Sequence, residues 1–175
     1  MTAISSGLFT CFSIFFVALG ASTVVHSADL VEEPGGTLVS ETRPLTLGEL
    51  HELYGNHTWL WNDGAGYFGE GDRRRFTAFT GSGAKASYAD GRWYAKDPGR
   101  ACFTARWFAS DGDGVATTCF EHKSDGQTIW QRRLPSGQWY VFSHIPPRPG
   151  DEVLKLKQGD LVSAGYERNK RAVSP

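Results

Sequence analysis

A repeated pattern of aromatic strands and glycine-containing turns constrains the fold of this chain more than any other feature. It is clearest in residues 56–79, which read NHTWLWNDGAGYFGEGDRRRFTAF. Trp59 and Trp61 stand two residues apart, so on a β-strand both rings point to one face. The letters NDG then signal a turn, and aromatic residues resume at Tyr67. The stretch therefore predicts an antiparallel hairpin meander.

The same alternation continues to residue 144 and predicts eight or nine short strands. The candidate strands span residues 57–62, 65–69, 74–80, 84–89, 92–95, 101–109, 115–123, 127–134 and 138–144. Gly, Pro, Asp and Ser separate them and favour tight turns. The predicted fold class is mainly β, an antiparallel up-and-down meander that forms a small barrel or a strongly curved sheet. Such a barrel has an interior that side chains fill or that holds one small ligand.

One short N-terminal helix is expected before the strands, within residues 44–56. Thr46 and Glu49 have the spacing of a capping box, in which each side chain satisfies a backbone amide at the start of a helix. Apolar residues recur at helical spacing after Thr46, and Gly55 follows them. This helix is placed where it can close one end of a barrel.

The first residues have the pattern of a signal peptide, which we assign to residues 1–27. Residues 8–25 carry no charge, and VHS at residues 25–27 fits the small-x-small cleavage pattern. Cleavage after Ser27 is the first choice and after Ala28 the second. An uncleaved membrane anchor is the alternative, since residues 1–7 lack Lys and Arg and the apolar run approaches a membrane-spanning length. The expected location is periplasmic or secreted.

The rest of the chain fits one domain, because 175 residues lie in the common range for a single domain. Residues 28–44 are acidic and without periodicity, and are interpreted as a flexible lead-in. Residues 45–160 form the predicted β-barrel-like domain. Residues 161–175 are polar and basic, and are interpreted as a disordered tail.

Two cysteines, Cys102 and Cys119, remain after the signal segment and are predicted to form a disulfide in an oxidising compartment. A turn at Asp111 and Gly112 would place Cys102 opposite Glu121, two residues from Cys119. A diagonal neighbour of this kind lies about 7–8 Å away, which is slightly too far for a bridge. A bulge in either strand would close the gap. Two buried free thiols are the alternative.

The sequence contains no recognised catalytic, cofactor-binding or metal-binding motif. The histidines stand at no metal-ligand spacing, and there is no GxSxG motif. Cys119 and His122 are three residues apart and would point to opposite faces of a strand. Lys and Arg total 18 against 19 for Asp and Glu, which argues against a nucleic-acid partner. We therefore expect a protein that is not an enzyme and that needs no cofactor or metal.

The aromatic residues are the best candidates for a ligand-binding role, as a sugar platform or as the lining of an apolar pocket. The alternative is that the rings fill the barrel. Arg106 is added to the set, as an anion-binding group inside a barrel or as the partner of Glu121 in a structural ion pair. The candidate ligand-binding residues are Trp59, Trp61, Tyr67, Trp93, Arg106, Trp107, Trp130 and Trp139.

Several of these segments together resemble a known family. The segments are LYGNHTWLW, GYF, RRFTA, GRWY, ACFTARW, TTCFEH and WYVF, and they cover roughly residues 45–144. In combination they are similar to the domain of unknown function 995 family, small exported proteins of proteobacteria. The resemblance implies a periplasmic or envelope location. It implies no established activity and no catalytic residue.

The function expected from the sequence is that of a non-enzymatic, exported β-barrel-like domain that binds a small ligand or a glycan or lipid of the cell envelope. The alternative is a structural or inhibitor-like protein that contacts a partner protein through its loops. Membrane contact is expected only through the signal segment if that segment is not cleaved.

Overall fold

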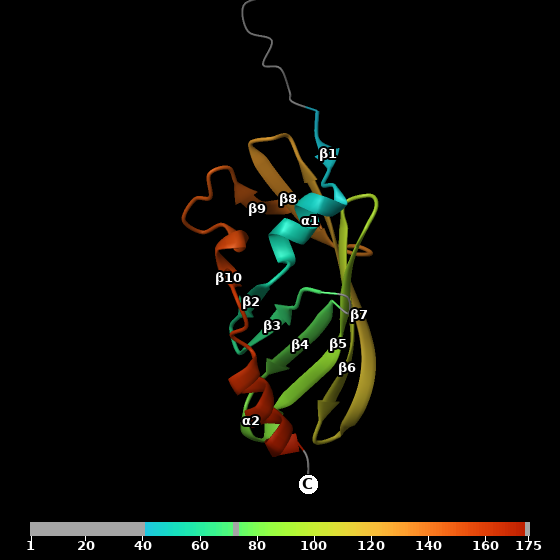
Figure 1. Cartoon of the computed structure of the whole chain (residues 1–175), viewed down its shortest axis with the longest axis vertical. Helices are drawn as coiled ribbons and strands as arrows, with labels where there is room; N and C mark the ends of the chain where they lie inside the picture. The colour runs from blue at the N-terminus through green and yellow to red at the C-terminus, as the bar shows by residue number, and fades with distance from the viewer. Residues whose placement is uncertain (1–40, 72–73, 174–175) are drawn as a thin grey trace, which may run out of the picture. The chain divides into compact units, whose positions relative to one another are not determined.

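The computed structural model describes residues 41–71 and 74–173, and the fold is given for that part of the chain. Residues 1–27, predicted as a signal peptide, lie outside the described residues, as does most of the lead-in predicted for residues 28–44. Figure 1 labels most of the elements. In chain order they are β1 (Arg43–Pro44), α1 (Leu47–Tyr54), β2 (His57–Trp61), β3 (Gly64–Phe68), β4 (Arg75–Thr80), the 3-10 turn η1 (Gly83–Lys85), β5 (Ser87–Lys96), β6 (Arg100–Ala109), β7 (Gly112–Ser124), β8 (Thr128–Arg133), β9 (Tyr140–His144), the 3-10 turn η2 (Glu152–Lys155), β10 (Leu156–Gln158) and α2 (Ser163–Val173).

The strands form one antiparallel meander in the order β10-β2-β3-β4-β5-β6-β7-β8-β9. The sheet curls into a half-barrel with β10 and β9 at its two edges (Figure 1). Strand β1 stands off this path and pairs with β7. The predicted fold class, mainly β with an antiparallel meander and strong curvature, is confirmed.

The two faces of the sheet carry separate apolar clusters. We call the inner face the one that packs around Tyr54 of α1, and the outer face the one that α2 covers in part. The inner cluster consists of Leu45, Leu50, Tyr54, Phe68, Phe76, Ala78, Ala89, Trp93, Ala101 and Ala105. The outer cluster consists of Ala65, Tyr88, Val162 and Tyr166. Protein side chains therefore fill the inside of the half-barrel.

Strand β5 is continuous, so the prediction of separate strands at residues 84–89 and 92–95 is wrong. Asp-Gly is a strong hairpin signal, and it led to a turn at Asp90 and Gly91. Gly91 instead allows close contact between strands, because a Cβ there would lie 2.1 Å from the carbonyl oxygen of Thr104 on β6. Asp90 forms an ion pair with Arg75 on β4. Both residues are thus explained by pairing within the sheet.

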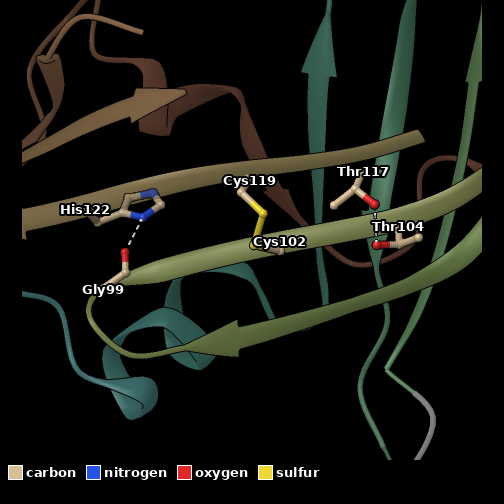
Figure 2. Close-up of a disulfide and its surroundings, with 6 residues drawn as sticks. All are labelled: Gly99, Cys102, Thr104, Thr117, Cys119 and His122. Atoms are coloured by element: carbon tan, nitrogen blue, oxygen red, sulfur yellow. Dashed lines mark hydrogen bonds between the residues drawn. A yellow bond between two sulfur atoms is a disulfide. The ribbon is translucent and has the colours of Figure 1, made fainter. Parts of the chain in front are cut away.

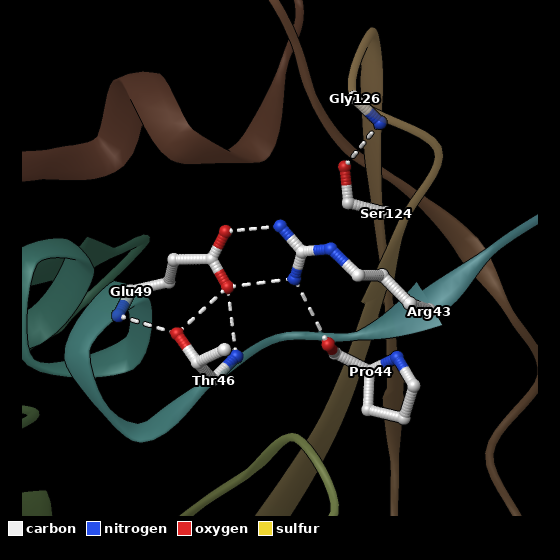
Figure 3. Close-up of polar contacts among 6 residues, drawn as sticks. All are labelled: Arg43, Pro44, Thr46, Glu49, Ser124 and Gly126. Carbon is white, nitrogen blue, oxygen red and sulfur yellow. Dashed lines mark hydrogen bonds and ion pairs between the residues drawn. The ribbon is translucent and has the colours of Figure 1, made fainter.

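Helix α1 starts with the capping box that the sequence predicts. The Thr46 hydroxyl accepts a hydrogen bond from the Glu49 amide at 3.3 Å, and the Glu49 carboxylate accepts one from the Thr46 amide at 2.7 Å. Arg43 donates to the same carboxylate at 2.6 and 2.8 Å (Figure 3). These hydrogen bonds, that of Arg43 first, lower the pKa of Glu49 to about 2.

Strand β1 connects the beginning of the described chain to the sheet. Arg43 pairs with Ser124, and Pro44 pairs with Lys123 of β7. Residues 43 and 44 are therefore part of the folded body. This corrects the end of the lead-in predicted for residues 28–44 and the start of the domain predicted for residues 45–160.

A second helix, α2, lies in the segment 161–175 that was predicted to be disordered, so that prediction is wrong for Ser163–Val173. The prediction of a single, N-terminal helix is wrong for the same reason, since the longer helix is C-terminal. Asn169 is 1% exposed and anchors α2 to the sheet. Its Nδ2 donates at 2.9, 3.1 and 3.0 Å to the backbone oxygens of Thr80, Gly81 and Ser87.

Glycine allows α2 to lie close to the outer face. A Cβ on Gly165 would lie 2.3 Å from the ring of Phe79 on β4. Val162 and Tyr166 are buried on the same side of the helix. The tail is polar overall, but Val162, Gly165 and Tyr166 recur at helical spacing and form this apolar face.

A hydrogen-bonded turn links β9, at one edge of the half-barrel, to β2, the neighbour of the other edge strand. Asp151, immediately before η2, accepts hydrogen bonds from the Arg148 amide at 2.8 Å and from the amide and Nδ1 of His144 at 2.7 and 2.9 Å. These contacts, that of Arg148 first, lower the pKa of Asp151 to about 2. Glu152 accepts a hydrogen bond from Nε1 of Trp59 at 3.1 Å. The turn thus contacts both β9 and β2.

Candidate functional site

Three of the predicted ligand-binding tryptophans, Trp59, Trp93 and Trp107, lie on the inner face among other rings. Trp93 is 2% exposed, and its ring centroid is 5.9 Å from that of Phe68. Trp59 is half-buried, with its ring 5.1 Å from that of Phe120. Trp107 is half-buried and packs on the inner cluster. These rings contribute to the core, where their contacts stabilise the sheet.

A buried polar network crosses the inner face. His122 and Gln131 are fully buried and Tyr54 is 1% exposed. Tyr54 Oη lies 2.8 Å from His122 Nε2 and accepts a hydrogen bond from Gln131 Nε2 at 2.7 Å. Tyr140, at the edge of the sheet, donates to Gln131 Oε1. The network satisfies each of these buried groups and leads from the surface to the core.

The network keeps its titratable groups neutral. Burial lowers the pKa of His122 to about 4, although a hydrogen bond to the Gly99 carbonyl favours the charged form. Burial raises the pKa of Tyr54 well above its usual value, and burial with nearby Glu152 raises the pKa of Tyr140 to about 12. At neutral pH these side chains therefore exchange hydrogen bonds without charge.

A pocket of about 730 Å³ lies at the rim of the half-barrel, and we call it the rim pocket. It lies where β5 runs on beyond the first residue of β4, since Arg75 pairs with Arg92 and the later residues of β5 pair with β6. Its lining residues are His51, Glu70, Gly71, Arg74, Arg92, Trp93 and Tyr94. Of these, Trp93 belongs to the ligand-binding set that the sequence predicts.

Trp93 holds two walls of the rim pocket in place. Its Nε1 donates to the carbonyl oxygen of Gly69 at 2.7 Å, and its amide donates to that of Arg74 at 2.9 Å. On the side of α1, the ring of His51 lies 5.1 Å from the ring of Trp93. One indole side chain therefore contacts both the helix and the connection between β3 and β4.

The charges at the rim pocket are mainly positive. Arg74 and Arg92 are both exposed, and neither forms an ion pair with another described residue. Burial lowers the pKa of His51, and Arg74 lowers it further, while Glu70 acts in the opposite direction. Two guanidinium groups thus remain available beside a ring that can donate or accept a hydrogen bond.

The other predicted aromatic residues lie away from this pocket. Trp61 is 37% exposed, and its Nε1 donates to Thr80 Oγ1 at 3.3 Å. Tyr67 is half-buried on the outer face and donates to Asn56 Oδ1 at 2.9 Å. Tyr67 lies on the opposite face from the inner rings, so the structure does not gather the predicted set into one site.

Trp130 and Trp139 form a separate group with two cations. Lys123 Nζ lies 5.8 Å from the ring centroid of Trp130 and 4.7 Å from that of Trp139. The Arg132 guanidinium lies 4.8 Å from the Trp139 centroid. Such cation–π contacts stabilise the sheet surface, and they occupy ring faces that a sugar would need.

Arg106 lies on the outer face, so its interpretation as a group inside a barrel is wrong. It is exposed and forms an ion pair with Asp113 on β7. Glu121, the partner considered from the sequence, instead accepts a hydrogen bond from Arg132 Nε at 2.7 Å. The predicted register placed Glu121 too close to this end of the hairpin.

The disulfide between Cys102 and Cys119 is confirmed, with 2.09 Å between the sulfur atoms (Figure 2). The two residues pair directly across β6 and β7, so the predicted diagonal register and its bulge are wrong. The turn occupies residues 110–111, one position earlier than predicted, because Ala109 pairs with Gly112. This shift brings the cysteines opposite each other.

Two features are absent from the described part of the chain. In residues 41–71 and 74–173, no three His, Cys, Asp or Glu side chains come together so that they could hold a metal ion. Within the same residues no helix is both long and apolar enough to cross a membrane.

Comparison with known proteins identifies the family but no activity. The family model described as "Protein of unknown function (DUF995)" matches residues 17–162. The chain belongs to the DUF995 family. The DUF995 match ends immediately before α2, and it carries no residue roles. No curated protein and no solved structure matches the chain.

The ligand-binding set predicted from the sequence includes Trp93 but not the other side chains of the rim pocket. The missed residues are His51, Glu70, Arg74, Arg92 and Tyr94. They come from α1, from the connection between β3 and β4, and from β5. The β4–β5 register, in which Arg75 pairs with Arg92, brings the residues of the β3–β4 connection close to those of β5. The turn predicted from the sequence at residues 90–91 is incompatible with this register.

Proposed function

We propose that this protein is a non-enzymatic, exported binding module that takes an anionic group of a small ligand or cell-envelope component in the rim pocket. The observation that carries the proposal is the pair Arg74 and Arg92. Both guanidinium groups line one pocket, and neither has an acidic partner among the described residues.

Several other arginines of the sheet and its edges are neutralised, although Arg133 of β8 has no ion pair with a described residue. The ion pairs are Arg43 with Glu49, Arg75 with Asp90, Arg106 with Asp113, and Arg132 with Glu121. A guanidinium that serves the fold is thus accompanied by a carboxylate in these cases. Within residues 41–71 and 74–173, the two arginines of the rim pocket lack that compensation and share one pocket, which favours a role toward a ligand.

The chemistry of the pocket suits a carboxylate or a phosphate. A guanidinium presents planar N–H donors in a fork that matches the two oxygens of such groups. Trp93 and Tyr94 add aromatic contact area for the body of the ligand. The volume of about 730 Å³ lies within the range of about 300–1,000 Å³ that is usual for small-molecule sites.

Export to the periplasm or the exterior of the cell is part of the proposal. The disulfide between Cys102 and Cys119 supports it, because disulfides persist in oxidising compartments and are rare in the cytosol. The uncharged N-terminal run at residues 8–25 supports it as well.

Isothermal titration with sodium glucuronate and with inorganic phosphate tests the proposal. We expect saturable binding of at least one anion, and about tenfold or more weaker binding by Arg92→Gln, because charge-assisted hydrogen bonds are lost. Arg106→Gln is the matched control, since Arg106 is also an exposed arginine on the outer face. The control should bind the anion as the wild type does.

The Trp93 indole N–H reports on the location of binding. Its NMR signal, assigned by comparison with Trp93→Phe, should shift during the titration because this group donates to Gly69 at the pocket wall. No saturable response to either anion, or equal binding by Arg92→Gln and wild type, would overturn the proposed function.

The alternative, contact with a partner protein through loops, rests on exposed aliphatic residues. Ile145, Leu154 and Leu161 are 52%, 42% and 55% exposed. They follow β9, lie in η2 and precede α2, respectively. Nothing in the described residues specifies the chemistry of such a partner, so we favour ligand binding at the rim pocket.

A further inference from the structure

Two smaller pockets continue the rim pocket along the outer face. The first, of about 280 Å³, has Arg75, Asp90 and Gly91 in its lining and shares Arg92 with the rim pocket. The second, of about 180 Å³, shares Arg75 with the first and reaches α2. The rim pocket and the first smaller pocket have Arg92 in common, and the two smaller pockets have Arg75 in common. We call the series the outer groove.

Strand register explains why these pockets line up. On the outer face Arg75 pairs with Arg92, and in the next row Thr77 pairs with Asp90. Thr77 pairs on its other side with Tyr67 of β3. Side chains two residues apart on a strand share a face, so these residues form two adjacent rows across β3, β4 and β5.

Helix α2 forms a wall of the groove. Tyr166 Oη lies 3.4 Å from Asp90 Oδ2, and the same carboxylate forms the ion pair with Arg75. The three side chains hold the middle of the groove together and neutralise its charge. The groove therefore runs from a positive end at the rim, over a neutral middle, to the side of α2.

The chemistry of the groove changes along its length. Arg74 and Arg92 dominate the rim end. The α2 end instead carries the carboxylates of Asp160 and Glu167, with hydroxyl groups and two tyrosine rings beside them. A chain that is anionic throughout would meet like charge at the α2 end. Neutral units rich in hydroxyl groups would find hydrogen-bond acceptors and ring faces there.

We propose that the outer groove binds an oligosaccharide whose acidic unit occupies the rim pocket and whose neutral sugar units extend along β4 and β5 to α2. This inference rests on the proposed function and names the ligand class of the same site. Pocket size supports it, because about 280 and 180 Å³ fall below the range of about 300–1,000 Å³ for separate small-molecule sites. The two smaller pockets therefore serve as subsites of one extended ligand.

Three probes separate charge from length. The first is glucuronate, a single acidic unit. The second is xylotetraose, a neutral chain, and the third is an aldotetraouronic acid, in which one uronic acid is joined to three xylose units. We expect the acidic tetrasaccharide to bind about tenfold or more tightly than glucuronate, because additional hydrogen bonds form along the groove. Xylotetraose should bind more weakly than either.

A variant at the α2 end tests the direction of binding. Glu167→Ala should bring the affinity for the acidic tetrasaccharide toward that of glucuronate, and it should leave glucuronate binding unchanged. Arg171→Ala is the matched control, since Arg171 is exposed on the same helix and does not line the groove pocket beside α2.

The outcomes distinguish this inference from the proposed function. Equal affinities for glucuronate and the acidic tetrasaccharide would overturn the proposal that the outer groove binds neutral sugar units, and would leave anion binding at the rim pocket in place. Binding of phosphate with no binding of either sugar acid would overturn the glycan class alone. Failure of all anions, or tightest binding by xylotetraose, would overturn both.

Discussion

The phenol of Tyr54 and the imidazole of His122 meet inside the half-barrel, with 2.8 Å between Tyr54 Oη and His122 Nε2. His122 Nδ1 lies 3.2 Å from the carbonyl oxygen of Gly99, and Figure 2 draws this contact as a dashed line. A carbonyl oxygen can only accept, so Nδ1 carries the proton and Nε2 accepts from Tyr54. A proton added to Nε2 would face the Gln131 amide nitrogen at 2.7 Å, which has no acceptor lone pair to offer. Burial and the neighbouring amide donor therefore favour neutral His122.

This arrangement predicts that the free energy of unfolding falls between pH 7 and pH 5. The pKa of His122 is lowered from 6.5 to about 4 in the folded protein, so in this window the unfolded chain binds more protons. The contribution of neutral His122 to the free energy of unfolding is fully present above pH 6.5, and it is lost as the pH falls toward 4. The expected loss from pH 7 to pH 5 is about 2 kcal/mol. Urea unfolding at a series of pH values measures it.

A direct titration of the imidazole provides the control for the pH prediction. The ring NMR signals of His122 should stay those of the neutral form at pH 5. In His122→Gln the change in stability between pH 7 and pH 5 should be smaller by about the same 2 kcal/mol. A wild-type stability that does not change across this window would contradict the prediction.

Removal of the Tyr54 hydroxyl should destabilise the fold through the same network. In Tyr54→Phe the imidazole of His122 loses a hydroxyl donor and Gln131 Nε2 loses an acceptor, both in a buried setting. The expected cost is about 1–3 kcal/mol. Tyr94→Phe is the control, because Tyr94 is 38% exposed and should change stability by less than about 0.5 kcal/mol. Equal unfolding midpoints for the two variants would argue against a structural role for the network.

The meander could be read from the sequence because its signals are local. A strand with one buried face alternates with period two, and Gly and Asp mark the turns between strands. Gly91 shows the limit of that reading, since the same Asp-Gly letters serve a turn in one place and close strand contact in another. Cys102 and Cys119 were paired correctly by compartment and number, while their register depended on a turn that the sequence left ambiguous.

The rim pocket and α2 could not be read in the same way, because they depend on contacts between distant segments. Arg74 and Arg92 become neighbours through the pairing of β4 with β5. Asn169 looks like part of a polar tail until the carbonyl oxygens that accept from its side chain are placed by β4 and β5. Propensity and composition describe a segment alone, whereas tertiary contacts decide these two features.

Gly165→Ala is expected to weaken the packing of α2, although alanine is the better helix former. The new Cβ would lie 2.3 Å from the Phe79 ring, which is itself packed in the outer cluster. Overpacking of this kind costs about 1–3 kcal/mol and outweighs a propensity gain of at most about 1 kcal/mol. Thermal or urea unfolding should show the loss.

Gly48→Ala in α1 is the matched control for this substitution. The nearest atom to its new Cβ is Thr46 Oγ1 at 4.0 Å, so no clash opposes the propensity gain. This variant should be more stable than wild type by about 0.5–1 kcal/mol. If both glycine variants gain stability, α2 does not depend on close approach at Gly165.

The disulfide should contribute substantially to stability, because it cross-links residues 17 positions apart. Closing a loop of about 15 residues removes unfolded-state entropy equivalent to about 3 kcal/mol. The double variant Cys102→Ala, Cys119→Ala should therefore unfold at lower urea concentration, with a loss of about 2–4 kcal/mol.

Reduction of the wild type is the better matched comparison, since it removes the bond and keeps both side chains. Cys102 is 3% exposed, so the variant also loses packing and its deficit should equal or exceed that of the reduced protein. Identical unfolding curves with and without reductant, together with titratable thiols in the untreated protein, would show that the two sulfur atoms are not bonded.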